Sequence, residues 1–115
     1  MHELSIAMSI VELAEEESER RGGLRVTAVH LRLGLLAGVV KDALLSSYEM
    51  ACEETSLAGS QLVVEEVPGV VYCPACDAQR PVRSSEWFSC SACGGVASEI
   101  VAGKELEVVS LEVEP

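Results

Sequence analysis

Basic residues are scarce in this sequence. Its 115 residues include 8 Lys and Arg against 19 Asp and Glu, which gives a formal net charge of −11. Proteins that bind nucleic acids neutralise phosphates with Lys and Arg, so this balance argues against an RNA- or DNA-binding protein. An acidic protein instead suits metal cations or a basic surface on a partner protein.

Aromatic side chains and long apolar runs are also in short supply. The chain has one Trp, two Tyr and one Phe, so we expect a core of Leu, Val, Ile and Ala. No segment approaches the roughly 20 apolar residues that a membrane-spanning helix needs. The first residues, Met-His-Glu, and the acidic run at 15–17 are unlike a secretory signal. We therefore expect a cytoplasmic protein with no membrane segment, where paired Cys-x-x-Cys motifs predict metal sites before disulfides.

The spacing of apolar residues predicts two helices and three strands. Helical periodicity covers residues 4–20 and 40–54. Alternation typical of strands covers residues 25–33, 61–67 and about 105–113. The residues expected on the buried face of the first helix are Leu4, Ala7, Met8, Val11 and Ala14, with Ile10 alongside.

The order of these elements indicates an α+β fold. A strand, a helix and a strand in succession favour a right-handed crossover with the first two strands parallel, and the third strand can return antiparallel beside the second. The prediction is two helices on a three-stranded mixed sheet, with an inserted zinc-ribbon-like module that carries four cysteines. Residues 1–69 plus 103–115 form the helix–sheet domain, and residues 70–102 form the zinc-binding module.

Four cysteines carry the strongest chemical signal. Cys73 and Cys76 are separated by two residues, and after thirteen more residues Cys90 and Cys93 repeat that spacing. Two residues between cysteines let both sulfurs of one tight turn reach the same ion, and two such turns make a four-sulfur set that favours Zn(II), with iron second. The closed shell of four sulfurs leaves no position for substrate, so we predict a structural zinc. Redox-active dithiols are the alternative.

Three further side chains lie near these features. Trp87 and Phe88 are expected to cover the metal turns with apolar surface, although one of them could instead be an exposed partner contact. Cys52, the fifth cysteine, falls at the flank of the apolar face of the second helix. We interpret it as a small, half-buried apolar residue, with a reactive thiol as the alternative.

The N-terminus offers a second donor set. A His at position two brings together three nitrogens: the terminal amine, the His2 backbone amide once deprotonated, and the His2 imidazole. Square-planar nitrogen coordination suits Ni(II) or Cu(II). Any chain that begins Met-His has this arrangement, so from spacing alone a solvated terminal His is the better interpretation.

Several motifs together resemble the HypA/HybF family of hydrogenase nickel-incorporation proteins. The resemblance extends over essentially the whole chain, through the order of helices and strands. It is carried by Met1-His2-Glu3-Leu4-Ser5, Cys73-Pro74-Ala75-Cys76, Cys90-Ser91-Ala92-Cys93-Gly94, Gly103-Lys104-Glu105-Leu106 and Ser110-Leu111-Glu112-Val113.

The resemblance implies a function and its sites. Members of this family are cytoplasmic metallochaperones, not enzymes, that deliver nickel to the [NiFe]-hydrogenase large subunit, and in some organisms to urease, with a partner GTPase, HypB. By position, Met1, His2 and Glu3 are the nickel-binding residues, and the four cysteines bind zinc. Asp42 is a weak candidate for a further nickel ligand, and we interpret His30 as a strand-face residue.

Two other functions compete with a nickel carrier. One is a zinc-ribbon adaptor that binds protein or RNA, although only Arg80 and Arg83 give the zinc module positive charge. The other is a rubredoxin-like electron carrier with iron in the four-sulfur site, which a red purified protein would reveal. Within the nickel-carrier interpretation, the acidic face formed by Glu12, Glu15, Glu16 and Glu19 is the expected docking surface for the GTPase, and a homodimer is left open.

Overall fold

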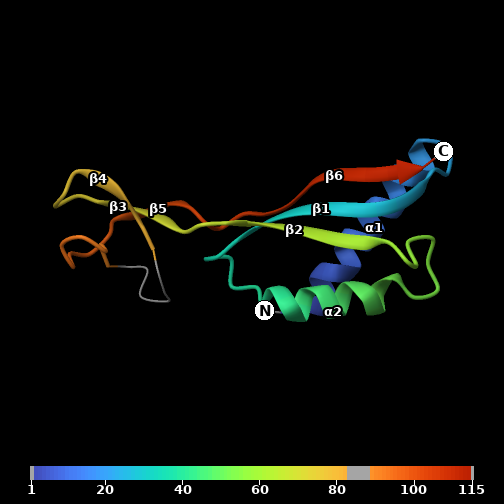
Figure 1. Cartoon of the computed structure of the whole chain (residues 1–115), viewed down its shortest axis with the longest axis horizontal. Helices are drawn as coiled ribbons and strands as arrows, with labels where there is room; N and C mark the ends of the chain where they lie inside the picture. The colour runs from blue at the N-terminus through green and yellow to red at the C-terminus, as the bar shows by residue number, and fades with distance from the viewer. Residues whose placement is uncertain (1, 83–88, 115) are drawn as a thin grey trace. The chain divides into compact units, whose positions relative to one another are not determined.

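The computed structural model describes residues 2–82 and 89–114, which contain two helices and six strands (Figure 1). In that part of the chain no helix is both long and apolar enough to cross a membrane. The elements are, in order, α1 (Glu3–Arg20), β1 (Arg25–Gly34), α2 (Lys41–Cys52), β2 (Gln61–Val67), β3 (Val70–Cys73), β4 (Ala78–Pro81), β5 (Glu99–Ala102) and β6 (Leu106–Glu114).

The chain divides into two compact units. The first comprises Met1–Leu31, Val39–Glu65 and Glu107–Pro115, and the second comprises Arg32–Gly38 and Glu66–Leu106. The first unit contains both helices, and the second contains all four cysteines of the Cys-x-x-Cys pairs.

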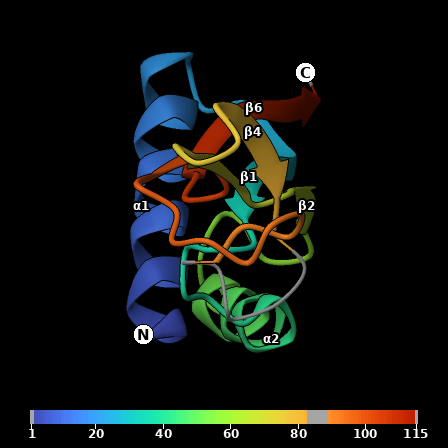
Figure 2. The same cartoon turned by 90° about the vertical axis from the view of Figure 1, so that its left-hand side faces the viewer.

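The first unit is built on helices α1 and α2 and the three-stranded sheet ordered β2-β1-β6 (Figure 1 and Figure 2). The helices and β1 supply most of its core, which is aliphatic apart from one tyrosine and one cysteine. The buried core residues are Ala7, Ile10, Val11, Ala14, Val26, Val29, Leu31, Leu44, Tyr48, Cys52, Leu57 and Leu62. The predicted two helices and three-stranded sheet are confirmed.

The predicted neighbour of the third strand was wrong. We expected it beside the second strand, but β6 lies on the opposite side of β1 from β2. The Gly34 N–H donates to the Glu105 carbonyl at 2.7 Å, and the Leu36 N–H donates to the Gly103 carbonyl at 2.7 Å. Both edges of β1 are hydrogen-bonded in this order, which makes β1 the central strand and leaves β6 at the edge.

The buried face of α1 is rotated from the one expected. Leu4 and Met8 are 43% and 58% exposed, whereas Ile10 is buried. Apolar residues at 4, 7, 8, 10, 11 and 14 cover a wide arc of the helix, so periodicity alone did not fix its centre. The predicted end of the helix is correct: the Gly23 N–H donates to the Ser18 carbonyl at 2.8 Å, and Gly22 and Gly23 both have positive φ.

A second sheet, ordered β4-β3-β5, was not predicted. Strand β3 pairs antiparallel with β4, with Val70 opposite Pro81 and Cys73 opposite Ala78, and antiparallel with β5. Each of these three strands has only four residues. Segments this short give little alternation to detect.

Candidate metal centre

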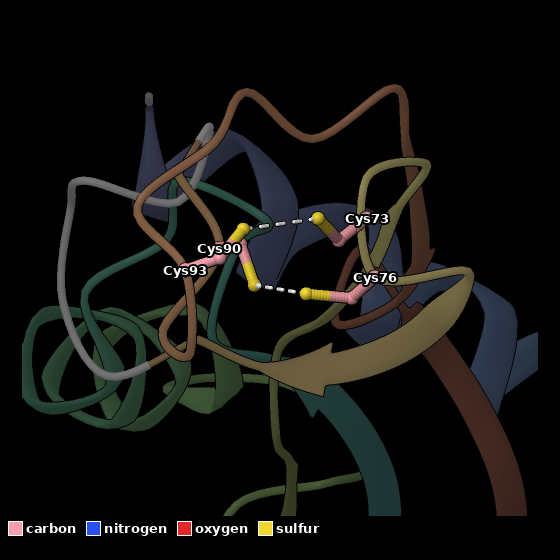
Figure 3. Close-up of side chains that lie close together, drawn as sticks. All are labelled: Cys73, Cys76, Cys90 and Cys93. Atoms are coloured by element: carbon pink, nitrogen blue, oxygen red, sulfur yellow. Dashed lines mark hydrogen bonds between the residues drawn. The ribbon is translucent and has the colours of Figure 1, made fainter.

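The sulfurs of Cys73, Cys76, Cys90 and Cys93 come together in one cluster (Figure 3). All four Sγ atoms lie within 4.8 Å of one another. The Sγ atoms of Cys73 and Cys93 are 3.6 Å apart, and those of Cys76 and Cys90 are 3.9 Å apart. All four cysteines are free thiols. The two Cys-x-x-Cys pairs, which are separate in sequence, therefore converge on one point.

The first cysteine pair lies on the turn between two strands. Strand β3 ends at Cys73 and β4 begins at Ala78, so the intervening residues must reverse the chain. The Asp77 N–H donates to the Pro74 carbonyl at 3.3 Å, and Asp77 has a φ of 50°. Asp is among the few residues that adopt this left-handed conformation readily.

The second cysteine pair lies on a similar turn. The Cys90 N–H donates to the Gly95 carbonyl at 2.7 Å, and the Gly94 N–H donates to the Cys90 carbonyl at 2.9 Å. Gly94 has a φ of 74°. In both turns, then, the residue after the second cysteine has left-handed backbone geometry: Asp77 in one and Gly94 in the other.

Backbone N–H groups of the second turn point at its sulfurs. The Ala92 N–H donates to Cys90 Sγ at 3.4 Å, and the Gly95 N–H donates to Cys93 Sγ at 3.3 Å. Hydrogen bonds from the N–H groups of Cys93 and Ala92 lower the pKa of Cys90 to about 6. The Gly95 N–H acts in the same direction on Cys93, but the sulfurs of Cys76, Cys73 and Cys90 outweigh it and raise the pKa of Cys93 to about 12. Without a metal, one proton is therefore shed readily and another is held by the crowded thiols.

Arg80 brings a positive charge to the sulfurs. The side chains of Cys76 and Cys90 interact with its guanidinium and raise the pKa of Arg80. The Arg80 Nε atom is buried and, among the described residues, has no hydrogen-bond partner. Four thiolates around a divalent ion carry a net charge of −2, which Arg80 partly offsets. The charge of Arg80 is evident from the sequence, and its position opposite Val71, on the strand that pairs with the one ending at Cys73, brings it near the cluster.

The cluster suits a divalent metal in a tetrahedral shell. A zinc–sulfur bond of about 2.3 Å implies sulfur–sulfur distances of about 3.8 Å across a regular tetrahedron. The observed distances of 3.6 Å and 3.9 Å lie on either side of that value. The donor set is entirely sulfur, because within the described residues no His, Asp or Glu joins the cluster. Such a set selects soft or borderline ions such as Zn(II) or iron.

Two of the three predicted nickel residues, His2 and Glu3, lie at the start of α1. Met1 is outside the described residues. His2 is the N-cap of α1, with extended backbone (φ −83°, ψ 90°) and no side-chain capping bond, and its carbonyl accepts the Ile6 N–H at 3.2 Å. Glu3 is the first helical residue, and its Oε2 atom accepts a hydrogen bond from the Val40 N–H at 3.2 Å. This last contact was not predicted from the sequence.

The remaining candidates have structural surroundings. His30 Nε2 lies 2.7 Å from Glu112 Oε2, across the β1–β6 pair, in agreement with a strand-face role. Cys52 is 3% exposed, so it belongs fully to the core and is not half-buried. Asp42 is exposed in the first turn of α2. Trp87 and Phe88, expected to cover the metal turns, lie outside the described residues.

The family match and the similar proteins of known name cover almost the whole chain and indicate the same family. Residues 1–113 match the family described as hydrogenase/urease nickel incorporation, metallochaperone, hypA. A protein of Roseiflexus sp. named hydrogenase maturation factor HypA is 50% identical over 114 residues, which cover 99% of this chain and 93% of the relative. A protein of the same name from Geobacter metallireducens is 45% identical and covers 99% of this chain and 100% of the relative.

Solved structures support the fold. The solution structure of the Ni metallochaperone HypA from Helicobacter pylori aligns with a TM-score of 0.67 at 23% identity, over 98% of this chain and 97% of that one. A second solution structure, of a HypA protein, aligns with a TM-score of 0.63 at 23% identity, over 99% of this chain and 97% of that one.

Proposed function

Because this chain belongs to the HypA family of hydrogenase and urease nickel-incorporation metallochaperones, we propose that it carries Ni(II) for the maturation of a nickel enzyme. The recipient is the large subunit of an [NiFe]-hydrogenase, or urease. The observation that carries the proposal is the family match over residues 1–113, which takes in both the Met-His-Glu start and the four cysteines.

The nickel-binding end in this proposal is Met1, His2 and Glu3, of which Met1 and His2 supply the three nitrogen donors. The terminal amine, the His2 amide and the His2 imidazole form fused chelate rings of a kind that suits square-planar Ni(II). His2 is exposed at the start of α1, which leaves its ring accessible to an arriving ion. The nickel is cargo, so the site must also release it.

The four cysteines hold a structural zinc in this proposal. Their sulfur distances and all-sulfur donor set favour Zn(II), and the filled shell excludes hydrolytic chemistry at the metal. On this view residues 70–102 are the zinc-binding module, and residues 1–69 with 103–115 are the nickel-binding domain. Replacing Cys76 or Cys93 with Ala should abolish the single zinc measured by native mass spectrometry, while the helical circular dichroism signal remains. Iron in its place would contradict the zinc assignment.

The protein acts in this proposal as a cytoplasmic carrier and not as an enzyme. Hydrolysis of GTP belongs to a HypB-type partner, and delivery requires contact with the hydrogenase large subunit. The alternative function, a zinc-ribbon adaptor that binds RNA, is disfavoured because the chain has a net charge of −11. A homodimer remains compatible with every contact described.

A nickel titration on protein with a native N-terminus tests the proposal. A Gly-Ser extension turns the terminal amine into a peptide nitrogen and breaks the chelate. We expect the extended protein and His2→Ala each to lose at least about tenfold in nickel affinity, about 1.4 kcal/mol, with zinc content unchanged. If the native protein binds no nickel, the proposed function is wrong. If both variants bind nickel as well as the native protein, the N-terminal site is wrong and the proposed function rests on the family match alone.

A further inference from the structure

Helix α2 lacks a cap of its own. Its N-cap residue is Val40, which makes no side-chain capping bond. A valine side chain has no acceptor atom, and Val is among the poorest N-cap residues. In a capping box, a Glu or Gln three residues after the N-cap bonds the N-cap N–H, but that position here is Ala43. An acceptor that the chain itself offers to the Val40 N–H must therefore come from outside α2.

Glu3 supplies that acceptor from the other helix. Its Oε2 atom lies 3.2 Å from the Val40 nitrogen, although the two residues are 37 positions apart in sequence. The acceptor is a carboxylate, which carries a negative charge at neutral pH. A negative charge at this end of a helix is also favoured by the helix dipole. The Glu3 side chain thus caps the start of α2 and links the first residue of α1 to that helix through one hydrogen bond.

His2 immediately precedes Glu3, the residue that makes this hydrogen bond. Its backbone is extended, and its carbonyl accepts the Ile6 N–H, so its position follows from the first turn of α1. The first turn of α1 is in turn held through Glu3. We propose that the Glu3 carboxylate is a positioning residue for nickel: it caps α2 at Val40 and thereby orients the His2 donors, and it does not itself ligate the ion.

This inference rests on the proposed nickel site at the N-terminus and gives Glu3 a specific part in it. A chelate that is already ordered loses less conformational entropy when the ion arrives, so the capping bond raises nickel affinity without adding a ligand. A Gln at position 3 keeps an oxygen that can accept the Val40 N–H, whereas Ala keeps none. The two variants therefore separate the capping role from a ligand role.

The experiment uses full-length protein with a native N-terminus. Glu3→Gln and Glu3→Ala are compared with the unsubstituted protein and with Glu12→Ala, a control that removes an exposed carboxylate from the same helix. Three quantities are measured: nickel affinity, the absorption and X-ray absorption spectra of the nickel-saturated protein, and hydrogen exchange of the Val40 amide. Zinc content and circular dichroism report on folding.

We expect Glu3→Ala to lower nickel affinity about tenfold and to speed exchange of the Val40 amide, with Glu3→Gln within about threefold of the unsubstituted protein in affinity. The spectra at saturation should be the same in all four proteins, because the ligand set is unchanged. A changed spectrum in Glu3→Gln, or an affinity loss in Glu3→Gln equal to that in Glu3→Ala, would make Glu3 a ligand. Unchanged affinity in Glu3→Ala would also overturn the inference. Failure of the unsubstituted protein to bind nickel would instead overturn the proposed function.

Discussion

Gly34 and Gly103 approach so closely that neither has room for a side chain. A Cβ atom on Gly34 would lie 2.0 Å from the Gly103 carbonyl oxygen, and one on Gly103 would lie 2.7 Å from the Cα atom of Gly69. The Leu36 side chain lies against both Gly69 and Gly103. Three chain segments of the second unit thus meet backbone to backbone, which only glycine permits.

Replacing Gly34 with Ala should therefore destabilise the protein. The methyl group collides with backbone atoms, which cannot move aside as a flexible side chain would, so we expect a loss of about 3 kcal/mol, at the upper end of the usual range for overpacking. Gly38→Ala is the matched control: its Cβ would meet nothing within 4 Å, and only its φ of 77° opposes the change. Urea unfolding of both variants gives the comparison. Equal losses in the free energy of unfolding would show that the close approach of Gly34 to Gly103 tolerates a side chain.

The close approach of these glycines also shows which features of the structure could be predicted from the sequence and which could not. Two Cys-x-x-Cys pairs bring their own local geometry, because two residues between ligands fix the turn, so the sulfur cluster followed from spacing alone. The convergence of Gly34, Gly69 and Gly103 depends on which strands become neighbours, and no local pattern carries that information. The same limit explains why β6 was expected beside β2.

Side-chain contacts between residues far apart in the sequence were also not predicted. The bond from Val40 to Glu3 joins two helices, and each residue alone looks ordinary: one is an apolar residue before a helix, the other an acidic residue in a first turn. The absence of a capping residue at Val40 was the available signal. It indicated that an acceptor was missing but not which residue would supply it.

Arg80 should slow the loss of metal from the cysteine cluster. Its guanidinium interacts electrostatically with the side chains of Cys76 and Cys90 and partly offsets negative charge on their sulfurs. We expect Arg80→Ala to weaken metal binding by about tenfold or more, as is common when a residue that contacts metal ligands is removed. Transfer of zinc to a chromophoric chelator measures this. Arg80→Lys keeps the charge but not the planar guanidinium, so its zinc affinity should lie between those of the unsubstituted protein and Arg80→Ala. Arg25→Ala removes an exposed arginine paired with Glu114 and should leave zinc affinity unchanged.

Acid should release the metal only at a pH well below neutrality. Protons compete with the ion for thiolates, so affinity falls as pH decreases. Hydrogen bonds from the Cys93 and Ala92 N–H groups hold the pKa of Cys90 at about 6, so its thiolate is present above that pH and is lost as the pH falls through it. We expect zinc to be retained at pH 7 and released in the acidic range, where protons displace the ion from the sulfurs, as followed with a chelator dye. Cys52→Ala, which leaves the cluster intact, should show the same profile, and release at pH 7 would contradict the prediction.

The acidic face of α1 should steer the proposed partner, a HypB-type GTPase. Glu12, Glu16 and Glu19 are exposed. Two neighbouring carboxylates are engaged within the protein: Glu15 accepts a hydrogen bond from the Ser56 hydroxyl at 3.3 Å, and Glu17 forms ion pairs with Arg20 and Arg21 at 2.7 Å and 2.8 Å. The electrostatic field that a partner meets on this helix therefore comes chiefly from the three exposed residues, and Glu12 and Glu16 are the two to change.

The double charge reversal Glu12→Lys and Glu16→Lys changes the net charge by four units without touching the contacts of Glu15 or Glu17. We expect association with a HypB-type GTPase to slow by about tenfold at low salt and to lose most of its salt dependence, because electrostatic steering acts mainly on the association rate. Glu49→Lys with Glu53→Lys makes the same change in net charge on and just beyond α2, and it controls for a general charge effect. Stopped-flow kinetics across a salt series distinguishes the cases. If the α2 pair slows association as much as the α1 pair, net charge and not a docking face governs the encounter; if neither does, the partner binds elsewhere.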